Sequence, residues 1–139
     1  MSTSLEPKIS FRMKLRLLLG DQLNENHPWF NSVEEQVLYV QMEMRQETDY
    51  APHHIQKLIA FFGAMRHFNN VLETRGHQTY YLKLDAPENS QDLVRNLQKI
   101  LKQHQVSSFE YQSPDEYRLS QQLKEFCFSL SIPSTEVDS

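Results

Sequence analysis

The feature that most constrains the fold is the alternation of short apolar runs with helical patterns along a chain of 139 residues. Five runs have the length and composition of β-strands. They cover residues 13–19, 37–42, 79–84, 108–111 and 135–137. Between the runs, apolar residues recur at helical spacing in residues 55–72, 93–101 and 119–130. Because strands that alternate with helices form parallel βαβ units, the sequence predicts a doubly wound α/β fold: a five-stranded, mostly parallel, Rossmann-like sheet with helices on both faces.

The predicted helix around residues 55–72 is the longest, with Pro52 suited to its first turn and Gly76 ending it. The stretch after Gly20 shows no clear pattern. The length of the chain suits one domain at residues 13–139, preceded by a flexible leader at residues 1–12. The chain stops soon after the fifth predicted strand starts, so we expect a domain-sized fragment of a longer protein.

Composition excludes several classes of function. The single cysteine, Cys127, excludes an internal disulfide and any metal or iron–sulfur site built on several thiolates of this chain. The net charge is −4 and the basic residues are scattered, so we expect no direct binding of nucleic acid. The leader lacks the features of a secretory signal and no run is long enough to span a membrane, which favours a cytoplasmic location.

The carboxyl ends of parallel strands meet at one rim of the sheet, where this fold class binds ligands. Four loops are expected there, at residues 20–24, 43–50, 85–90 and 112–116. The segment at residues 43–54 concentrates acidic, basic and aromatic groups directly after a buried strand. We therefore take the four loops as the candidate site.

Gly20, Asp21 and Gln22 come directly after the first predicted strand. In one interpretation Gly20 lets the backbone approach a ligand, to which Asp21 presents an acceptor and Gln22 an amide. In the other, Gly20 supplies turn geometry and Asp21 caps the next segment of the chain. Neither a G-x-G-x-x-G turn nor a phosphate-binding Gly-Lys-Ser/Thr is present, which argues against a nucleotide triphosphate.

In the segment at residues 43–54, Glu47 is suited to accept hydrogen bonds from a flat heterocycle, Tyr50 to stack on it, and His53 to add a polar contact from the first turn of the following helix. The alternative is a solvated loop in which Asp49 suits the helix dipole and Arg45 forms a surface ion pair. Neighbouring histidines without a helical H-E-x-x-H pattern do not form a zinc site. No nucleophile elbow occurs either, so an independent hydrolase is not expected.

Several blocks occur in order along the chain. They are residues 15–23, Glu43 to Glu47, Tyr50 with His53 and His54, residues 64–68, and residues 113–119, which begin Ser-Pro-Asp. With these blocks, residues 14–139 resemble the amino-terminal domain of the deoxyribodipyrimidine photolyase-related proteins. These proteins are the bacterial, iron–sulfur-containing branch of the photolyase and cryptochrome superfamily, which includes prokaryotic (6-4) photolyases.

The resemblance implies a longer flavoprotein whose helical carboxyl-terminal region binds FAD, carries a cubane iron–sulfur cluster on four cysteines and repairs damaged DNA. It implies that this domain packs against that flavin domain, contacts DNA only through it, and is not catalytic on its own. It also implies a pocket for the antenna chromophore 6,7-dimethyl-8-ribityllumazine. The motif match assigns to this pocket Gly20, Asp21, Gln22, Glu47, Tyr50, His53, Pro114 and Asp115.

The sequence supports two functions as hypotheses. The first is a light-harvesting antenna domain that holds its chromophore in a fixed orientation, so that absorbed energy passes to the flavin. The second is an interaction module that positions the flavin domain and has an empty pocket.

Overall fold

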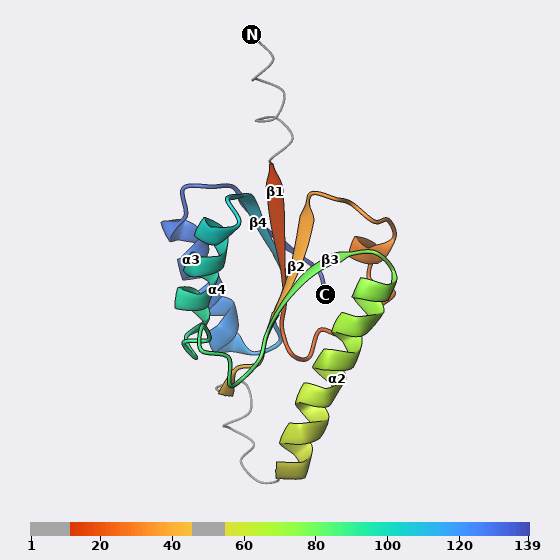
Figure 1. Ribbon diagram of the computed structural model, residues 1–139. Helices are drawn as coiled ribbons and strands as arrows, with labels where there is room; N and C mark the ends of the chain where they lie inside the picture. The colour runs from red at the N-terminus through yellow and green to blue at the C-terminus, as the bar shows by residue number, and fades with distance from the viewer. Residues whose placement is uncertain (1–11, 46–54) are drawn as a thin grey trace.

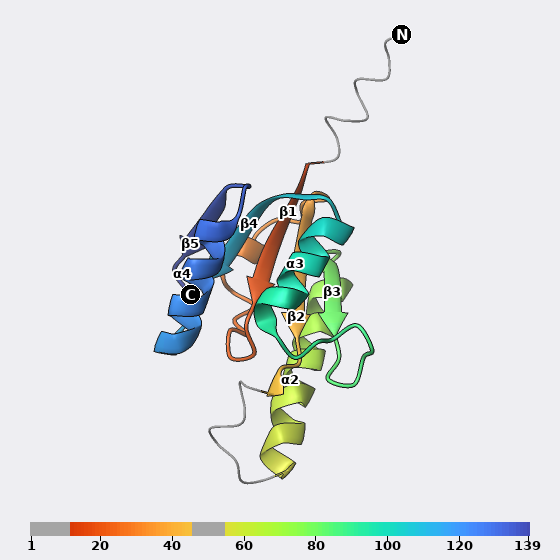
Figure 2. The ribbon, with the colours of Figure 1, turned by 90° about the vertical axis from the view of Figure 1, so that its left-hand side faces the viewer.

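The computed structural model describes residues 12–45 and 55–139, and within them the predicted parallel α/β fold is confirmed. Five strands form one sheet in the order β3-β2-β1-β4-β5, and every neighbouring pair is parallel (Figure 2). The strands are β1 (Met13–Leu18), β2 (Val37–Met42), β3 (Gln78–Leu82), β4 (Val106–Gln112) and β5 (Ser134–Val137).

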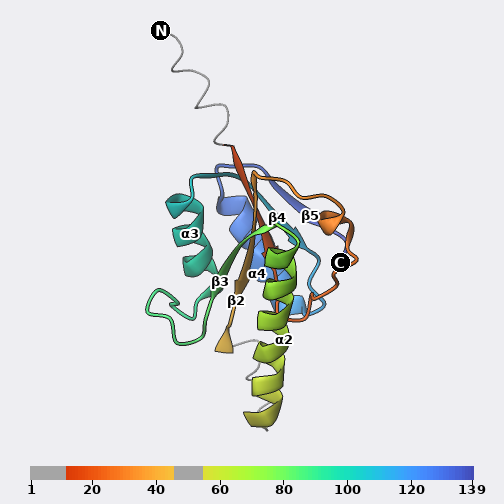
Figure 3. The same cartoon turned by 45° about the vertical axis from the view of Figure 1, so that its right-hand side comes forward.

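Helices cover both faces of the sheet, as expected for a doubly wound fold. On one face lie α3 (Leu93–Gln103) and α4 (Tyr117–Ser129) (Figure 1). On the other lie α2 (Ile55–Thr74) and the short 3-10 helix η1 (Pro28–Phe30), and Figure 3 brings this face forward. The predicted start of the long helix at Pro52 lies outside the described residues. No helix of the described part of the chain is long and apolar enough to cross a membrane.

The larger hydrophobic core fills the space between the sheet and the α3–α4 layer. Because side chains alternate along a strand, Leu15 and Leu17 of β1 point to this side together with Phe109 of β4. Leu97 of α3 and Leu123 of α4 pack against them, and all five side chains are fully buried. Truncation of any of these to alanine would cost about 2–5 kcal/mol of folding free energy, so this core fixes the position of the central strand.

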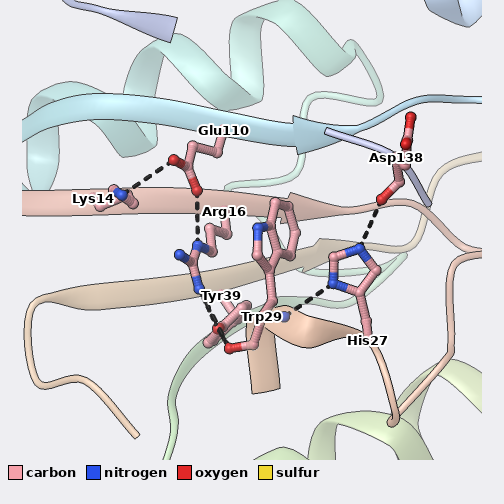
Figure 4. A network of polar contacts seen from close by, with 7 residues as sticks. All are labelled: Lys14, Arg16, His27, Trp29, Tyr39, Glu110 and Asp138. Atoms are coloured by element: carbon pink, nitrogen blue, oxygen red, sulfur yellow. Dashed lines mark hydrogen bonds and ion pairs between the residues drawn. The ribbon is translucent and has the colours of Figure 1, made fainter. Parts of the chain in front are cut away.

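The opposite face of β1 carries a buried arginine. Arg16 Nε donates to Glu110 Oε1 of β4 at 2.9 Å, and Nη1 donates to the Tyr39 hydroxyl of β2 at 2.8 Å (Figure 4). The guanidinium carbon also lies 5.0 Å from the centre of the Trp29 ring. Burial by itself would lower the pKa of Arg16, but the hydrogen bonds with Glu110 and Tyr39 outweigh it and the pKa is raised. The arginine therefore stays charged and joins three strands to η1.

The strand order reverses at β1. The chain passes from β1 outward to β2 and β3, and then returns through α3 to β4 and β5 on the other side. The connections therefore diverge at the carboxyl ends of β1 and β4, the topological switch point at which open α/β sheets bind ligands.

The stretch after Gly20, for which the sequence shows no clear pattern, forms a loop and η1 in place of a full helix. Pro28 occupies the first turn of η1, and the ring of His27 accepts a hydrogen bond from the Trp29 N–H as its N-cap. Strand limits differ from the predicted ones by one to two residues: β3 is Gln78–Leu82, and β4 extends to Val106 and Gln112. The apolar pattern does not reach these strand ends because they contain the polar residues Gln78, Ser107 and Gln112. Gln78 and Gln112 nevertheless pair with neighbouring strands, and Ser107 lies between two residues that do.

Candidate functional site

A cavity of about 500 Å³ lies at the switch point, where β1 and β4 end. Three segments form its walls, from the chain after β1, after β4 and after β5. The lining residues are Asp21, Gln22, Leu23, Asn24, Gln112, Ser113, Asp115 and Ser139. The first and last of the four predicted rim loops therefore meet at one cavity.

Gln22 joins two walls of this cavity. Its side-chain Nε2 donates to the backbone carbonyls of Gln112 and Ser113 at 3.2 and 3.3 Å, and its Oε1 accepts from the Leu19 N–H at 3.0 Å. Because both ends of the buried amide bond to the chain, Gln22 holds the carboxyl ends of β1 and β4 together. The sequence predicts Gln22 as a ligand contact, and the structure adds this bridging role.

Asp21 and Asp115 are exposed carboxylates on two different walls. Among the described lining residues there is no lysine, arginine or histidine. The cavity therefore offers acceptors to hydroxyl or N–H groups and no cation to a phosphate. Gly20 is buried directly before this wall, and Pro114 is half-buried between two lining residues.

The third wall is the chain after β5. The Ser113 N–H donates to the Val137 carbonyl at 2.8 Å and its hydroxyl donates to Glu136 Oε2 at 2.7 Å. The pKa of Glu136 is lowered because the hydroxyls of Ser113 and Tyr111 donate to its carboxylate. Next to this wall, the ring of His27, the N-cap of η1, lies 2.7 Å from the Asp138 carbonyl (Figure 4).

A second polar cluster lies where β2 and β3 end, around the fully buried Glu43. Its carboxylate accepts from Arg66 Nε at 2.6 Å and Nη2 at 2.9 Å, from the Tyr81 hydroxyl at 2.5 Å and from the Leu84 N–H at 2.8 Å. Burial would raise the pKa of Glu43, but these hydrogen bonds outweigh it and the pKa is lowered. The pKa of Tyr81 is raised by its burial and by the hydrogen bond to Glu43.

The same cluster fixes the loop after β3. The Glu43 carbonyl accepts from Asn89 Nδ2 at 3.0 Å and from Gln91 Nε2 at 3.3 Å, while Gln91 Oε1 accepts from the Arg45 N–H at 2.8 Å. Gln91 itself has a φ of 60°, a left-handed conformation that costs about 1 kcal/mol for a residue other than glycine. The rim is therefore divided between the cavity near β1, β4 and β5 and this cluster near β2 and β3.

The sequence prediction did not identify Glu43, Arg66 or His27 as individual functional groups. For Glu43 a signal exists, because it lies on the same side of the chain as Tyr39 and Gln41 and comes directly after a fully buried strand. A carboxylate there requires a cation, and Arg66 of α2 is that partner. For His27 the sequence gives no comparable signal.

Three of the eight predicted site residues line the cavity, namely Asp21, Gln22 and Asp115. Gly20 and Pro114 adjoin it in the chain. Glu47, Tyr50 and His53 lie outside the described residues. So does Asp49, for which the sequence predicts contact with solvent. Within residues 12–45 and 55–139, no group of three or more His, Cys, Asp or Glu side chains is arranged to hold a metal ion. Cys127 is half-buried and packs against the larger core.

The chain matches the model of one protein family, described as deoxyribodipyrimidine photo-lyase-related protein, over residues 16–139. It is also similar to a curated protein of Agrobacterium fabrum named as a (6-4) photolyase. The two are 28% identical over 120 residues, which is 86% of this chain and 24% of the relative. The chain therefore spans about a quarter of the length of that relative.

Proposed function

Because this chain belongs to the deoxyribodipyrimidine photo-lyase-related protein family, we propose that it is an antenna domain that binds 6,7-dimethyl-8-ribityllumazine and passes absorbed light energy to a flavin. The cavity of about 500 Å³ at the switch point is the observation that carries the proposal. Ligand cavities of this size, at this point of an open α/β sheet, are typical of small-molecule sites.

The chemistry of the cavity suits the chromophore. A ribityl chain presents hydroxyl groups, which donate to carboxylates such as Asp21 and Asp115. Leu23 adds an apolar contact beside them. Binding and orienting a planar chromophore requires no nucleophile and no covalent step, so the domain is not catalytic by itself in this proposal.

The same residues do not suit the other cofactors of a photolyase. A pyrophosphate such as that of FAD would face two carboxylates and no cation among the described lining residues. An iron–sulfur cluster on four thiolates cannot be built from the single cysteine of this sequence. We therefore assign FAD and the cluster to a separate flavin-binding region.

That flavin-binding region is the partner in this proposal. The relative named as a (6-4) photolyase is about four times as long as the matched part, which leaves room for such a region. Damaged DNA would bind through it, because the basic residues of this chain are scattered and the net charge is −4. The parent protein would then be a light- and FAD-dependent DNA photolyase in the cytoplasm.

Titration of the chain with 6,7-dimethyl-8-ribityllumazine tests the proposal. Binding would change the fluorescence of the lumazine, and the affinity should fall when Asp21 or Asp115 is replaced by alanine. Glu125→Ala, which removes an exposed carboxylate of α4 away from the cavity, is the matched control. An affinity that is the same for all these variants, or no binding at micromolar concentrations, would exclude this cavity as the antenna site.

Exposed aromatic side chains favour a second function, an interaction module. On α4, Phe128 is 91% exposed and Tyr117 is 73% exposed. Aromatic residues are enriched in the contact surfaces between proteins. If Phe128→Ser separates this domain from the flavin region while changes at Asp21 and Asp115 leave light capture intact, the interaction module is the better description.

A further inference from the structure

Three hydrogen-bonded bridges surround the cavity at the switch point and tie its walls to one another or to neighbouring segments. The first wall is residues 21–24, the second is residues 112–115 and the third is residues 138–139. Gln22 joins the first wall to the second, and Ser113 joins the second to the end of β5. The third bridge runs from His27, three residues after the first wall, to Asp138 of the third wall.

Both ring nitrogens of His27 are used, and their partners define its protonation. Nδ1 lies 3.0 Å from the backbone N–H of Trp29, which can only donate, so Nδ1 is the acceptor. Nε2 lies 2.7 Å from the carbonyl of Asp138, which can only accept, so Nε2 carries the hydrogen (Figure 4). The ring is thus a neutral bridge, 5% exposed, between the N-cap of η1 and the chain after β5.

We propose that His27 is a positioning residue for the cavity, and that its bond to Asp138 holds the third wall in place for the chromophore. Asp138 directly precedes Ser139, which lines the cavity. Without the bridge, the Asp138 carbonyl would bond to water and the third wall would move away from the first. The part of this inference that concerns the chromophore rests on the proposed function.

Two substitutions separate the two hydrogen bonds of the ring. In His27→Asn the side-chain oxygen takes the position of Nδ1, so the cap on Trp29 is kept and the bond to Asp138 is lost. In His27→Gln the amide nitrogen takes the position of Nε2, so the bond to Asp138 is kept and the cap is lost. Each variant loses one hydrogen bond, and their thermal midpoints should fall by similar amounts.

Binding of 6,7-dimethyl-8-ribityllumazine should distinguish the variants. His27→Asn should bind about tenfold more weakly than the wild-type chain, while His27→Gln should bind within about twofold of it. A residue that acted only through overall stability would weaken binding equally in both. Equal weakening would therefore overturn the proposal.

Amide hydrogen exchange gives a readout that needs no ligand. The Ser113 amide donates to the Val137 carbonyl, next to the third wall, at 2.8 Å. It should exchange faster in His27→Asn and at the wild-type rate in His27→Gln, whereas the Trp29 amide should show the reverse. If the wild-type chain does not bind lumazine, the proposed function fails, and the exchange result alone decides whether His27 positions the third wall. A Ser113 amide that exchanges at the wild-type rate in His27→Asn would overturn this positioning role.

Discussion

Two guanidinium nitrogens of Arg66 lie 2.6 and 2.9 Å from the two carboxylate oxygens of Glu43. The carboxylate is fully buried at the end of β2, whereas the arginine side chain is half-exposed on α2. This two-point contact ties the long helix to the rim of the sheet, and Tyr81 adds the neighbouring strand to it.

Glu43→Gln should lower the free energy of unfolding by about 2 kcal/mol. The NH₂ group of the new amide would face N–H or O–H donors that in the wild type donate to a carboxylate oxygen, so hydrogen bonds would be lost. The loss is smaller than for a fully buried ion pair because water can reach Arg66. Urea unfolding followed by the fluorescence of Trp29, the single tryptophan, measures it. Glu125→Gln, an exposed carboxylate change, should leave stability within about 0.5 kcal/mol of the wild type.

The stabilising effect of Glu43 should also depend on pH. Its pKa in the folded chain is below the ordinary value of 4.5, so its contribution is complete above about pH 4.5 and is lost as the pH falls through the folded pKa. The difference in stability between the wild type and Glu43→Gln should therefore be constant near neutral pH and shrink in acid. A difference that grew in acid would contradict the charged, hydrogen-bonded state of Glu43.

His77 should make the fold sensitive to weak acid. Burial, with the nearby charges of Arg75 and Arg16, lowers its pKa from 6.5, so the unfolded chain takes up this proton at a higher pH than the folded chain. Stability is then lost as the pH falls below about 6.5. His77→Phe keeps ring contacts like those with Phe30 and Tyr39 and should flatten this slope.

The control for this measurement is His67→Gln, which changes an exposed histidine of α2. Its slope of stability against pH between pH 7 and 5 should match that of the wild type. The same slope in His77→Phe as in the wild type would mean that His77 does not carry the effect.

The cavity should discriminate against phosphorylated ligands. The 5′-phosphate of the lumazine would meet Asp21 and Asp115, so it should bind about fivefold more weakly than the free ribityl form at low ionic strength. Asp21→Asn and Asp115→Asn should each reduce the difference in affinity between the two forms, and so should added salt. Parallel fluorescence titrations with the two ligands provide the ratio, and equal affinity for both would argue against carboxylates near the ribityl end.

Two glycines should respond in opposite ways to alanine. Gly63 is exposed within α2 and an added Cβ meets nothing within 4 Å, so Gly63→Ala should stabilise the chain by about 0.5–1 kcal/mol. Gly76 has a φ of 99°, which alanine rarely adopts, so Gly76→Ala should destabilise it by at least about 1 kcal/mol. Thermal unfolding of the two variants against the wild type tests both signs.

The apolar pattern is sufficient to predict the fold because parallel strands buried on both faces leave a strong signal. Leu15, Leu17 and Val40, each at most 1% exposed, belong to runs that the sequence already marks as strands. The rim on which the cavity lies can also be deduced from the sequence, since the loops after parallel strands share one rim, but the sequence predicts four loops there and does not single out the first and fourth. Asp21 and Asp115, both assigned to the site from the sequence, line this cavity, and their part in ligand binding stays a prediction.

Contacts within that rim could not be predicted in the same way. The role of Gln22 depends on where the carbonyls of residues 112 and 113 lie, ninety residues away, and that distance is set by the pairing of β1 with β4. His27 likewise depends on the path of the chain after β5. Such contacts depend on the folded geometry, because the sequence around a glutamine or histidine in a polar loop does not indicate which residue it will bond to.

The strand order determines the order in which the strands of the sheet can pair during folding. β1 opens the described chain, yet one of its two neighbours is β4, and residues such as Leu15 and Phe109 pair across more than ninety positions. During synthesis β1 can pair with β2 early, but its other edge stays open until residues 106–112 have been made. Assembly of the central strand is therefore a late event that closes a long loop, and a chain cut before β4 would expose that edge to pairing with other molecules.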